Sequence, residues 1–200
     1  MGSTLDLWDY RRRVHDQYRR VRDRGPGPES WARWVVDRDE LFARHSQSPI
    51  EDRARFTGLP YFPYDPRWRT SGRFTVGDYE SAVVGHSGEG TTRFAKIGVV
   101  EFELASNPGR LEVLWLDAYG GGLFLPFRDA SNGVSTYGGG RYLLDTVKGA
   151  DLGHTGDEIT LDFNFAYHPS CVHSSRWSCP LAPPANRLPF AVEAGERLAT

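Results

Sequence analysis

The chain has 200 residues, 39% of them hydrophobic and 13% aromatic, which is enough for one domain with a sizeable core and argues against wholesale disorder. Its formal net charge of −2 argues against a dedicated nucleic-acid-binding protein, because phosphate binding needs a surplus of positive charge. No stretch approaches the roughly 20 apolar residues of a membrane span and the first residues lack a signal-peptide core, so we expect a cytoplasmic protein with reduced cysteines and no membrane partner.

The N-terminal third predicts helices. The first is expected over about residues 5–23, with Thr4 as N-cap and apolar residues at 3–4 spacing, and "GPGP" at 25–28 ends it. A second is expected over about 29–44. A capping-box pattern from Ser48 to Glu51 predicts a short third helix, followed by an irregular, proline-rich aromatic arm. We assign residues 1–28 to a helical extension and 29–200 to a single β-rich domain with a proline-rich C-terminal arm.

From about Ser71 the pattern changes to short β runs separated by turn residues. Hairpin turns are predicted at 107–109, 131–133 and 155–157, where Gly or Asn can supply positive φ. Such short connections give antiparallel neighbours. The prediction is a mainly β (α+β) fold: an antiparallel β-meander, closed or nearly closed into a barrel, with two to three N-terminal helices packed on it.

The run "EITLDFNFAYH" (158–168) predicts a long final strand with an apolar face and a polar face. Asp162, Asn164 and His168 fall on the polar face. Two interpretations remain open. The face is wetted by solvent, as is common in antiparallel sheets, or its polar groups line the mouth or interior of the barrel and orient a small ligand.

The segment "TYGGGRY" (136–142) places Arg141 directly after three glycines, in a strand that looks buried. The glycines predict a bulge or a close approach of the backbone to another group. A buried guanidinium must be paired, either with an internal carboxylate such as Asp129 or Asp162, or with an anionic group of a ligand. The segment lacks the features of a P-loop or a dinucleotide fold, so it does not support a nucleotide cofactor.

The stretch "DFNFAYHPSCVHSSRWSCPL" (162–181) contains four ligand-capable residues: His168, Cys171, His173 and Cys179. Their spacing departs from the paired steps of structural zinc sites, so a metal site is only one alternative. A thiol site is another, because an imidazole next to Cys171 would lower the pKa of the thiol and make it nucleophilic. Inert packing of the cysteines is the third.

Two long C-terminal motifs, "LPFRDASNGVSTYGGGRYL" (125–143) and "LDFNFAYHPSCVHSSRWSCPLAPPANRLPFAVEAGE" (161–196), resemble the bacterial domain-of-unknown-function family numbered 1684. The stretch 45–69 is similar to the N-terminal part of that family, so the resemblance covers about residues 30–198. It implies no activity, but it draws attention to the matching positions. These are Asp129, Gly133, Tyr137, Gly138, Gly140, Arg141, Tyr142, Asp162, Asn164, Tyr167, Cys171, Cys179, Pro180 and Asn186.

This chain also departs from the family pattern. His168 and His173 stand where the family usually has Asn and Tyr, and Ala185 stands where it tends to have Glu. Chemistry based on these imidazoles would therefore be particular to this member.

Three hypotheses follow. The first is a small-molecule-binding protein with a polar pocket at one end of the barrel, acting on an anionic metabolite by cofactor-independent acid–base chemistry of the isomerase, lyase or hydrolase type. Its ligand-binding residues would be Arg141, Gly138, Gly140, Asn164 and Asp129. Its catalytic candidates would be Asp162, Tyr137, Tyr167, His168, Cys171 and His173.

The second hypothesis is a non-catalytic protein with a buried Arg–Asp network. The third is a metal-dependent enzyme that holds zinc with His168, Cys171, His173 and Cys179. The residues leave open whether the protein is an enzyme and how many subunits it has.

Overall fold

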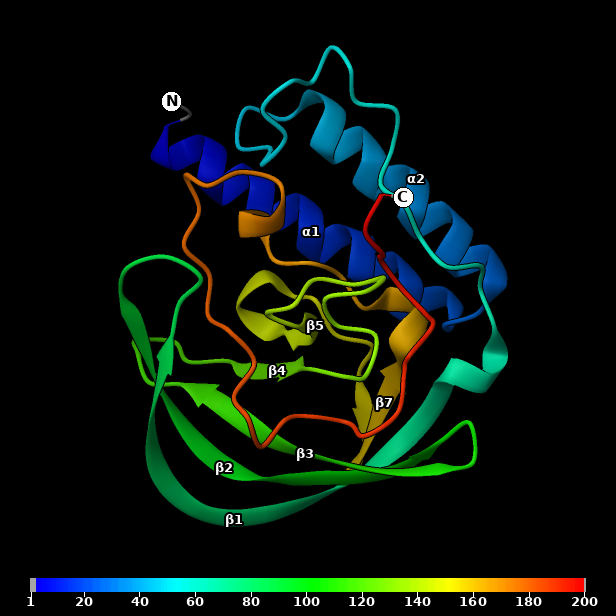
Figure 1. Ribbon diagram of the computed structural model, residues 1–200, viewed down its shortest axis with the longest axis vertical. Helices are drawn as coiled ribbons and strands as arrows, with labels where there is room; N and C mark the ends of the chain where they lie inside the picture. Colours follow the sequence, from blue (N-terminus) through cyan, green and yellow to red (C-terminus); the bar gives the residue numbers. More distant parts are fainter. Residues whose placement is uncertain (1–2, 200) are drawn as a thin grey trace.

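Two antiparallel helices lie across a strongly curved sheet of seven strands in the computed structural model, which describes residues 3–199 (Figure 1). The helices are α1 (Thr4–Arg24) and α2 (Pro28–Arg44). The strands are β1 (Arg69–Gly85), β2 (Thr91–Leu104), β3 (Asn107–Leu116), β4 (Leu123–Phe127), β5 (Arg141–Asp145), β6 (His154–Thr155) and β7 (Glu158–Asp162). Four short 3-10 helices lie between them: η1 (Pro66–Trp68), η2 (Thr146–Lys148), η3 (Phe163–Phe165) and η4 (Ser170–Val172).

Local capping determines where the two helices begin. The N-cap of α1 is Ser3, one residue before the predicted Thr4, because the Ser3 hydroxyl accepts from the Asp6 N–H at 3.1 Å and the Asp6 carboxylate accepts from the Ser3 N–H. Helix α2 begins at Pro28, whose preset φ suits the first helical position.

The predicted third helix does not form. The Ser48 hydroxyl donates to the Phe42 carbonyl at 2.5 Å and accepts from the Ile50 N–H, which closes a local turn after α2. Glu51 accepts from the Ser174 hydroxyl and does not complete a capping box. The capping residues are therefore used in other contacts, and the structure has two α-helices among the residues described.

The seven strands form one antiparallel sheet in the order β5-β4-β3-β2-β1-β7-β6. The barrel prediction was wrong, because the sheet stays open between β5 and β6. Within residues 3–199, the outer edge of β5 pairs through single-residue bridges, from Tyr142 to Tyr167 and from Asp145 to Ala150, and not with β6 or β7. The predicted antiparallel, mainly β architecture is otherwise confirmed.

The predicted long final strand is shorter than expected. Strand β7 ends at Asp162, whose side chain accepts from the Asn164 N–H at 3.0 Å and caps η3. The 3-10 turn breaks the alternation of the two faces, so Phe163, Asn164 and Phe165 are all buried.

One predicted turn is also displaced. Strands β2 and β3 are joined at Ala105 and Ser106, which have φ values of 48° and 65°, and Asn107 to Gly109 already belong to β3. A turn at Gly156, between β6 and β7, lies where it was predicted.

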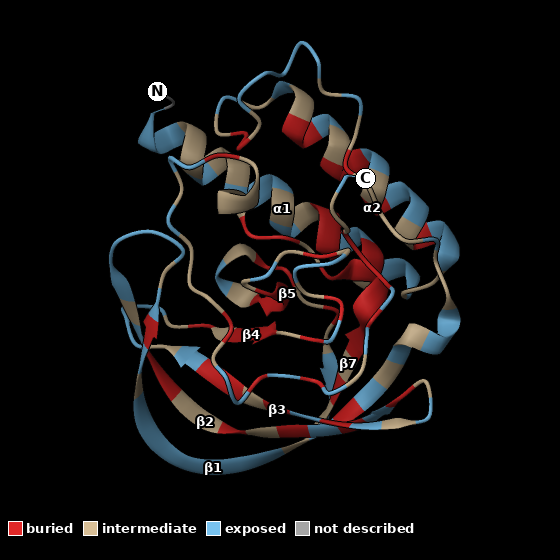
Figure 2. Cartoon of the chain, viewed as in Figure 1, coloured by how far each residue is buried: buried red, intermediate tan, exposed pale blue. Residues whose placement is uncertain are grey.

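The core lies inside the curve of the sheet and beneath the helices (Figure 2). Apolar side chains from β2 to β5 and β7 pack against the C-terminal arm, whose Leu188, Val192 and Ala194 are buried. Helix α1 contributes Tyr18 and Val21 to a second cluster. Strand β1 is exposed along most of its length (Figure 2). Within residues 3–199, no helix is both long and apolar enough to cross a membrane.

Candidate functional site

Arg141 lies at the start of β5 in a filled interior, where its guanidinium is fully buried. One Nη donates to Asp129 Oδ2 at 2.8 Å and to the Val192 carbonyl at 2.8 Å, and the other donates to the carbonyl of Ala194. Burial lowers the pKa of Arg141, and the ion pair with Asp129 opposes that effect. The structure therefore favours the internal ion pair over an anionic ligand as the partner of this arginine.

Asp162 and Asn164 do not converge with Arg141. The Asn164 amide donates to the Asp65 carbonyl at 2.9 Å and accepts from the Asp65 N–H at 3.0 Å. These two hydrogen bonds hold the irregular segment before β1 against η3. Asp162 contacts Asn164 and, at 3.4 Å, the Tyr64 hydroxyl. Burial raises the pKa of Asp162. Both side chains have structural partners.

The glycine run allows the protein's own C-terminal arm to approach closely. Gly140 has a φ of 98°, and a Cβ there would lie 2.5 Å from the Phe127 carbonyl oxygen and 3.0 Å from Ala182 Cβ. A Cβ at Gly138 would meet no atom within 4 Å. The absence of a side chain at Gly140 thus allows β4 and the segment around Ala182 to pack against it.

His168 and His173 point toward Glu196, a residue that the sequence analysis did not single out. His173 Nε2 lies 3.1 Å and His168 Nδ1 lies 3.5 Å from Glu196 Oε1, and the His168 N–H donates to Oε2. Arg38 of α2 pairs with Glu196 Oε2 at 2.8 Å. Burial opposes ionisation of Glu196, but the ion pair with Arg38 and the two histidines outweigh it and hold its pKa well below the usual range.

The position of Arg38 could have been found in the sequence. It lies four residues after Trp34 and four before Phe42, so it falls on the buried face of α2. A charged residue at such a position must find an opposite charge inside the fold. No comparable signal marks Glu196, because it lies in an irregular segment.

The proposed zinc ligands are not brought together. The two histidines contact Glu196, while the neighbours of Cys171 are Cys179, Ser87 and Tyr137. Among the residues that the structure describes, no group of three or more His, Cys, Asp or Glu side chains is placed to hold a metal ion.

Cys171 and Cys179 form a pair of free, half-buried thiols. The neighbouring Cys179 thiol, and after it the hydroxyls of Ser87 and Tyr137, lower the pKa of Cys171 to about 6 against the effect of burial. The neighbouring Cys171 and burial raise the pKa of Cys179. The opposite directions of the two shifts favour the thiolate form at Cys171 and the protonated form at Cys179.

Three segments that are distant in the sequence position this pair. Cys171 lies in η4, and Tyr137 lies in the loop before β5, where its N–H donates to His168 Nε2 at 3.2 Å. Ser87 lies in the β1–β2 connection and donates its N–H to the Cys179 carbonyl at 2.9 Å, while its hydroxyl accepts from the Cys179 N–H at 3.2 Å. The sequence motifs contain Tyr137 and both cysteines but give no signal for Ser87, because its contact with Cys179 joins residues about ninety positions apart.

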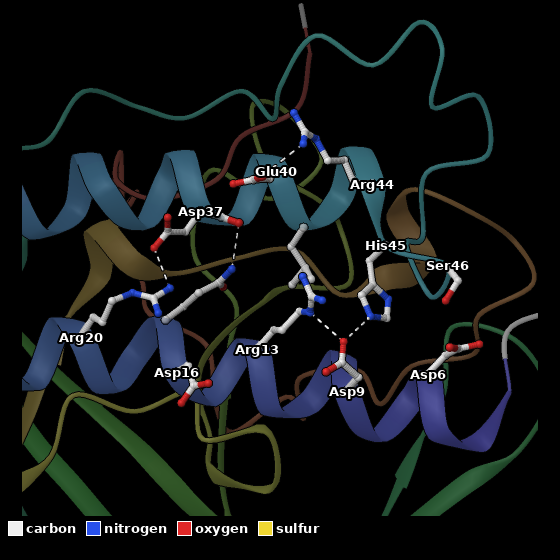
Figure 3. Close-up of a pocket in the computed structure, with 12 residues that line it drawn as sticks. Asp6, Asp9, Arg13, Asp16, Arg20, Asp37, Glu40, Arg44, His45 and Ser46 are labelled. Atoms are coloured by element: carbon white, nitrogen blue, oxygen red, sulfur yellow. Dashed lines mark hydrogen bonds and ion pairs between the residues drawn. The ribbon is translucent and has the colours of Figure 1, made fainter.

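A groove of about 570 Å³ lies between α1 and α2, and its charged side chains are largely paired with one another (Figure 3). Asp9 contacts both Arg13 and His45, and Arg20 contacts Asp37 at 2.8 Å. These pairs lie at the surface between two helices, and we interpret the groove as a solvated helix–helix boundary.

A second cavity, of about 280 Å³, lies at the open end of the sheet. Phe74, Leu123, Leu144 and Ile159 are in its wall. None of the residues that the sequence predicted for a site lines this cavity, so the polar pocket expected at one end of a barrel does not coincide with it.

Comparison with known proteins supports the resemblance seen in the motifs. The family model described as "Protein of unknown function (DUF1684)" matches residues 54–197. A solution NMR structure of an uncharacterized protein from Haloarcula marismortui is similar, with 41% sequence identity and a TM-score of 0.60, over 82% of this chain and 90% of that one. No curated protein matches this chain. The chain therefore belongs to the DUF1684 family, as its C-terminal motifs predicted.

Proposed function

We propose that this protein carries out thiol–disulfide chemistry, with Cys171 as the attacking thiolate and Cys179 as the resolving thiol. The observation that supports the proposal is a pair of free, half-buried cysteines that lie beside each other, with the hydroxyls of Ser87 and Tyr137 near one of them. The thiolate is the reactive form of cysteine, and these neighbours favour it at neutral pH.

The proposed substrate is a disulfide, RS–SR. The Cys171 thiolate attacks one sulfur, a mixed disulfide forms and RS⁻ leaves. Cys179 then gives up its proton and attacks Cys171 Sγ, which releases the second RSH and leaves a Cys171–Cys179 disulfide. The substrate gains two electrons and the protein loses two, and a low-molecular-weight thiol returns the pair to the reduced state by the same exchange in reverse.

The positions of the histidines favour this reaction over hydrolysis by a cysteine nucleophile. A cysteine hydrolase uses an imidazole beside the thiol as its proton acceptor and donor. Here His168 and His173 contact Glu196, and the neighbours of Cys171 are a second thiol and two hydroxyls. A second thiol next to the first is the feature that a resolving step needs.

The test is exchange with oxidised glutathione, followed by intact-protein mass spectrometry. The reduced wild type is expected to lose the mass of two hydrogen atoms as the internal disulfide forms. Cys179→Ser is expected to accumulate a glutathione adduct on Cys171, and Cys171→Ser to react far more slowly. A stable adduct on the wild type, or equal reactivity of the two single variants, would contradict the assigned roles.

The same pair predicts a pH profile. Alkylation of Cys171 by iodoacetamide should be slow in acid, rise with pH as the thiolate forms, and have its midpoint at about 6. Ser87→Ala and Tyr137→Phe each remove a donor to the thiolate, so both should move the midpoint to higher pH. Tyr119→Phe, a change at a fully exposed tyrosine, is the matched control and should leave it unchanged. A midpoint near the ordinary value for cysteine would refute the activation.

A second candidate is a non-catalytic protein with a buried charge network. The Arg141–Asp129 pair favours it, because both groups are fully buried and engaged by protein atoms. Thiols that neither form the internal disulfide nor show a lowered pKa would favour this candidate over the first.

A further inference from the structure

A small cavity, partly open to the surface, lies beneath the helices. It has a volume of about 50 Å³, and α1, α2, η2 and residues 167–170 contribute to its wall. A buried water needs at least about 10–15 Å³ of such volume, so the cavity holds roughly three or four non-hydrogen atoms.

Two tyrosines that line the cavity have hydroxyls with no hydrogen-bond partner among the residues that the structure describes. They are Tyr18, which is 2% exposed, and Tyr167, and both oxygen atoms are buried. An unsatisfied buried polar group costs about 1–3 kcal/mol, so native structures normally give such groups a partner. Two such hydroxyls on residues that line one cavity point to a bound molecule that would supply the missing hydrogen-bond partners.

The charges and hydrogen-bonding groups of the other lining residues indicate which kind of molecule would bind. Arg38 and Lys148 line the cavity, together with the side chains of Tyr10 and Ser170. The carboxylates that pair with the two cations, Glu196 and Asp145, are not among the lining residues. Burial raises the pKa of Tyr18 and Tyr167, so both phenols keep their protons and can donate. The wall is therefore mainly apolar, includes several hydrogen-bond donors and has no carboxylate.

We propose that this cavity binds a small carboxylate or oxoanion of three or four non-hydrogen atoms, held by the hydroxyls of Tyr18 and Tyr167 between Arg38 and Lys148. Lys148 has a side chain that is 38% exposed and lies at the margin through which the anion enters. Because both cations already have carboxylate partners, the expected dissociation constant is on the order of a millimolar.

Formate is the probe, because it has three non-hydrogen atoms and a single carbon-bound proton. Saturation-transfer NMR with irradiation of the aromatic protons should give a formate signal that saturates with concentration, at ionic strength held constant with sodium chloride. Tyr18→Phe and Tyr167→Phe should each weaken binding at least fivefold. Tyr119→Phe, which changes a fully exposed tyrosine, should bind like the wild type.

Size selection gives a second measurement that does not depend on the variants. Acetate and nitrate should displace formate from the wild type, whereas benzoate should not, because it exceeds the cavity. The proposal would be overturned if formate gave no saturable signal, if the tyrosine variants bound formate as tightly as the wild type, or if benzoate displaced formate. The cavity would then be interpreted as a site of ordered water. Cys171→Ser should bind formate normally, so this result and that of the thiol experiment can be told apart.

Discussion

Arg141 illustrates how the surroundings of one residue decide its role. A guanidinium inside a protein requires an opposite charge and several acceptors, and the sequence alone allowed either a ligand or Asp129 to provide them. In the structure Asp129 and the carbonyls of Val192 and Ala194 do so, and the site is closed to solvent. The arginine thus links β5 to the C-terminal arm.

At the same scale, Arg141→Ala is expected to destabilise the protein by about 3–5 kcal/mol, because it leaves Asp129 buried without its partner. Urea denaturation measures the loss. The double variant Arg141→Met, Asp129→Asn should lose less than the sum of the two single variants, since it removes both charges.

Arg110→Ala is the control. Its side chain is 55% exposed and lies 3.9 Å from Glu101, so we expect a change of less than about 1 kcal/mol. An Arg141→Ala protein as stable as the wild type would show that the ion pair is not structural and would restore the ligand interpretation.

At the scale of elements, the glycine run before β5 allows close packing of the backbone against neighbouring segments. Gly140 combines a positive φ with contacts that leave no space for a side chain, whereas Gly133 has a φ of 80° with open space, and Gly138 has open space without a positive φ. These three positions separate backbone strain from steric exclusion within one loop.

The prediction at this scale is a graded series of stability losses. Gly140→Ala should cost more than about 2 kcal/mol, because strain and a clash with the Phe127 carbonyl add up. Gly133→Ala should cost about 1 kcal/mol from strain alone, and Gly138→Ala less than about 0.5 kcal/mol. Thermal unfolding of the three variants checks the order, and equal losses at Gly138 and Gly140 would disprove the packing role.

At the scale of the whole molecule, α1 covers part of the core. Tyr18 and Val21 are each 2% exposed and pack with Ala150, Leu152 and Phe165. The family model starts at residue 54, so this helix lies outside the matched segment. Even so, it buries a cluster that would otherwise face water.

Removal of residues 1–27 should therefore lower the melting temperature and increase the binding of a hydrophobic dye, because the cluster under α1 becomes exposed. The double substitution Leu5→Ala, Trp8→Ala is the control, since these side chains are 71% and 61% exposed. A truncated protein that melts like the full chain would mean that α1 is a dispensable extension.

Several features followed from the sequence by itself. The apolar periodicity predicted α1 and α2, and the alternating runs with short turns predicted an antiparallel sheet, because both patterns depend on local spacing. The C-terminal motifs predicted the family. The sequence also made Tyr137 and Cys171 catalytic candidates and Cys179 a possible zinc ligand, and these roles stay predictions.

Other features were decided only by tertiary structure, because they depend on contacts between distant segments. Closure of the sheet was prevented by bridges from β5 to Tyr167 and Ala150, which no local pattern encodes. His168 and His173 both contact Glu196, which lies more than twenty residues later in the sequence. Ser87 reached the thiol pair through a hairpin tip that docks on Cys179. Short-range spacing determines which elements form, whereas the partner of a buried charge or thiol is determined by which segments the fold brings together.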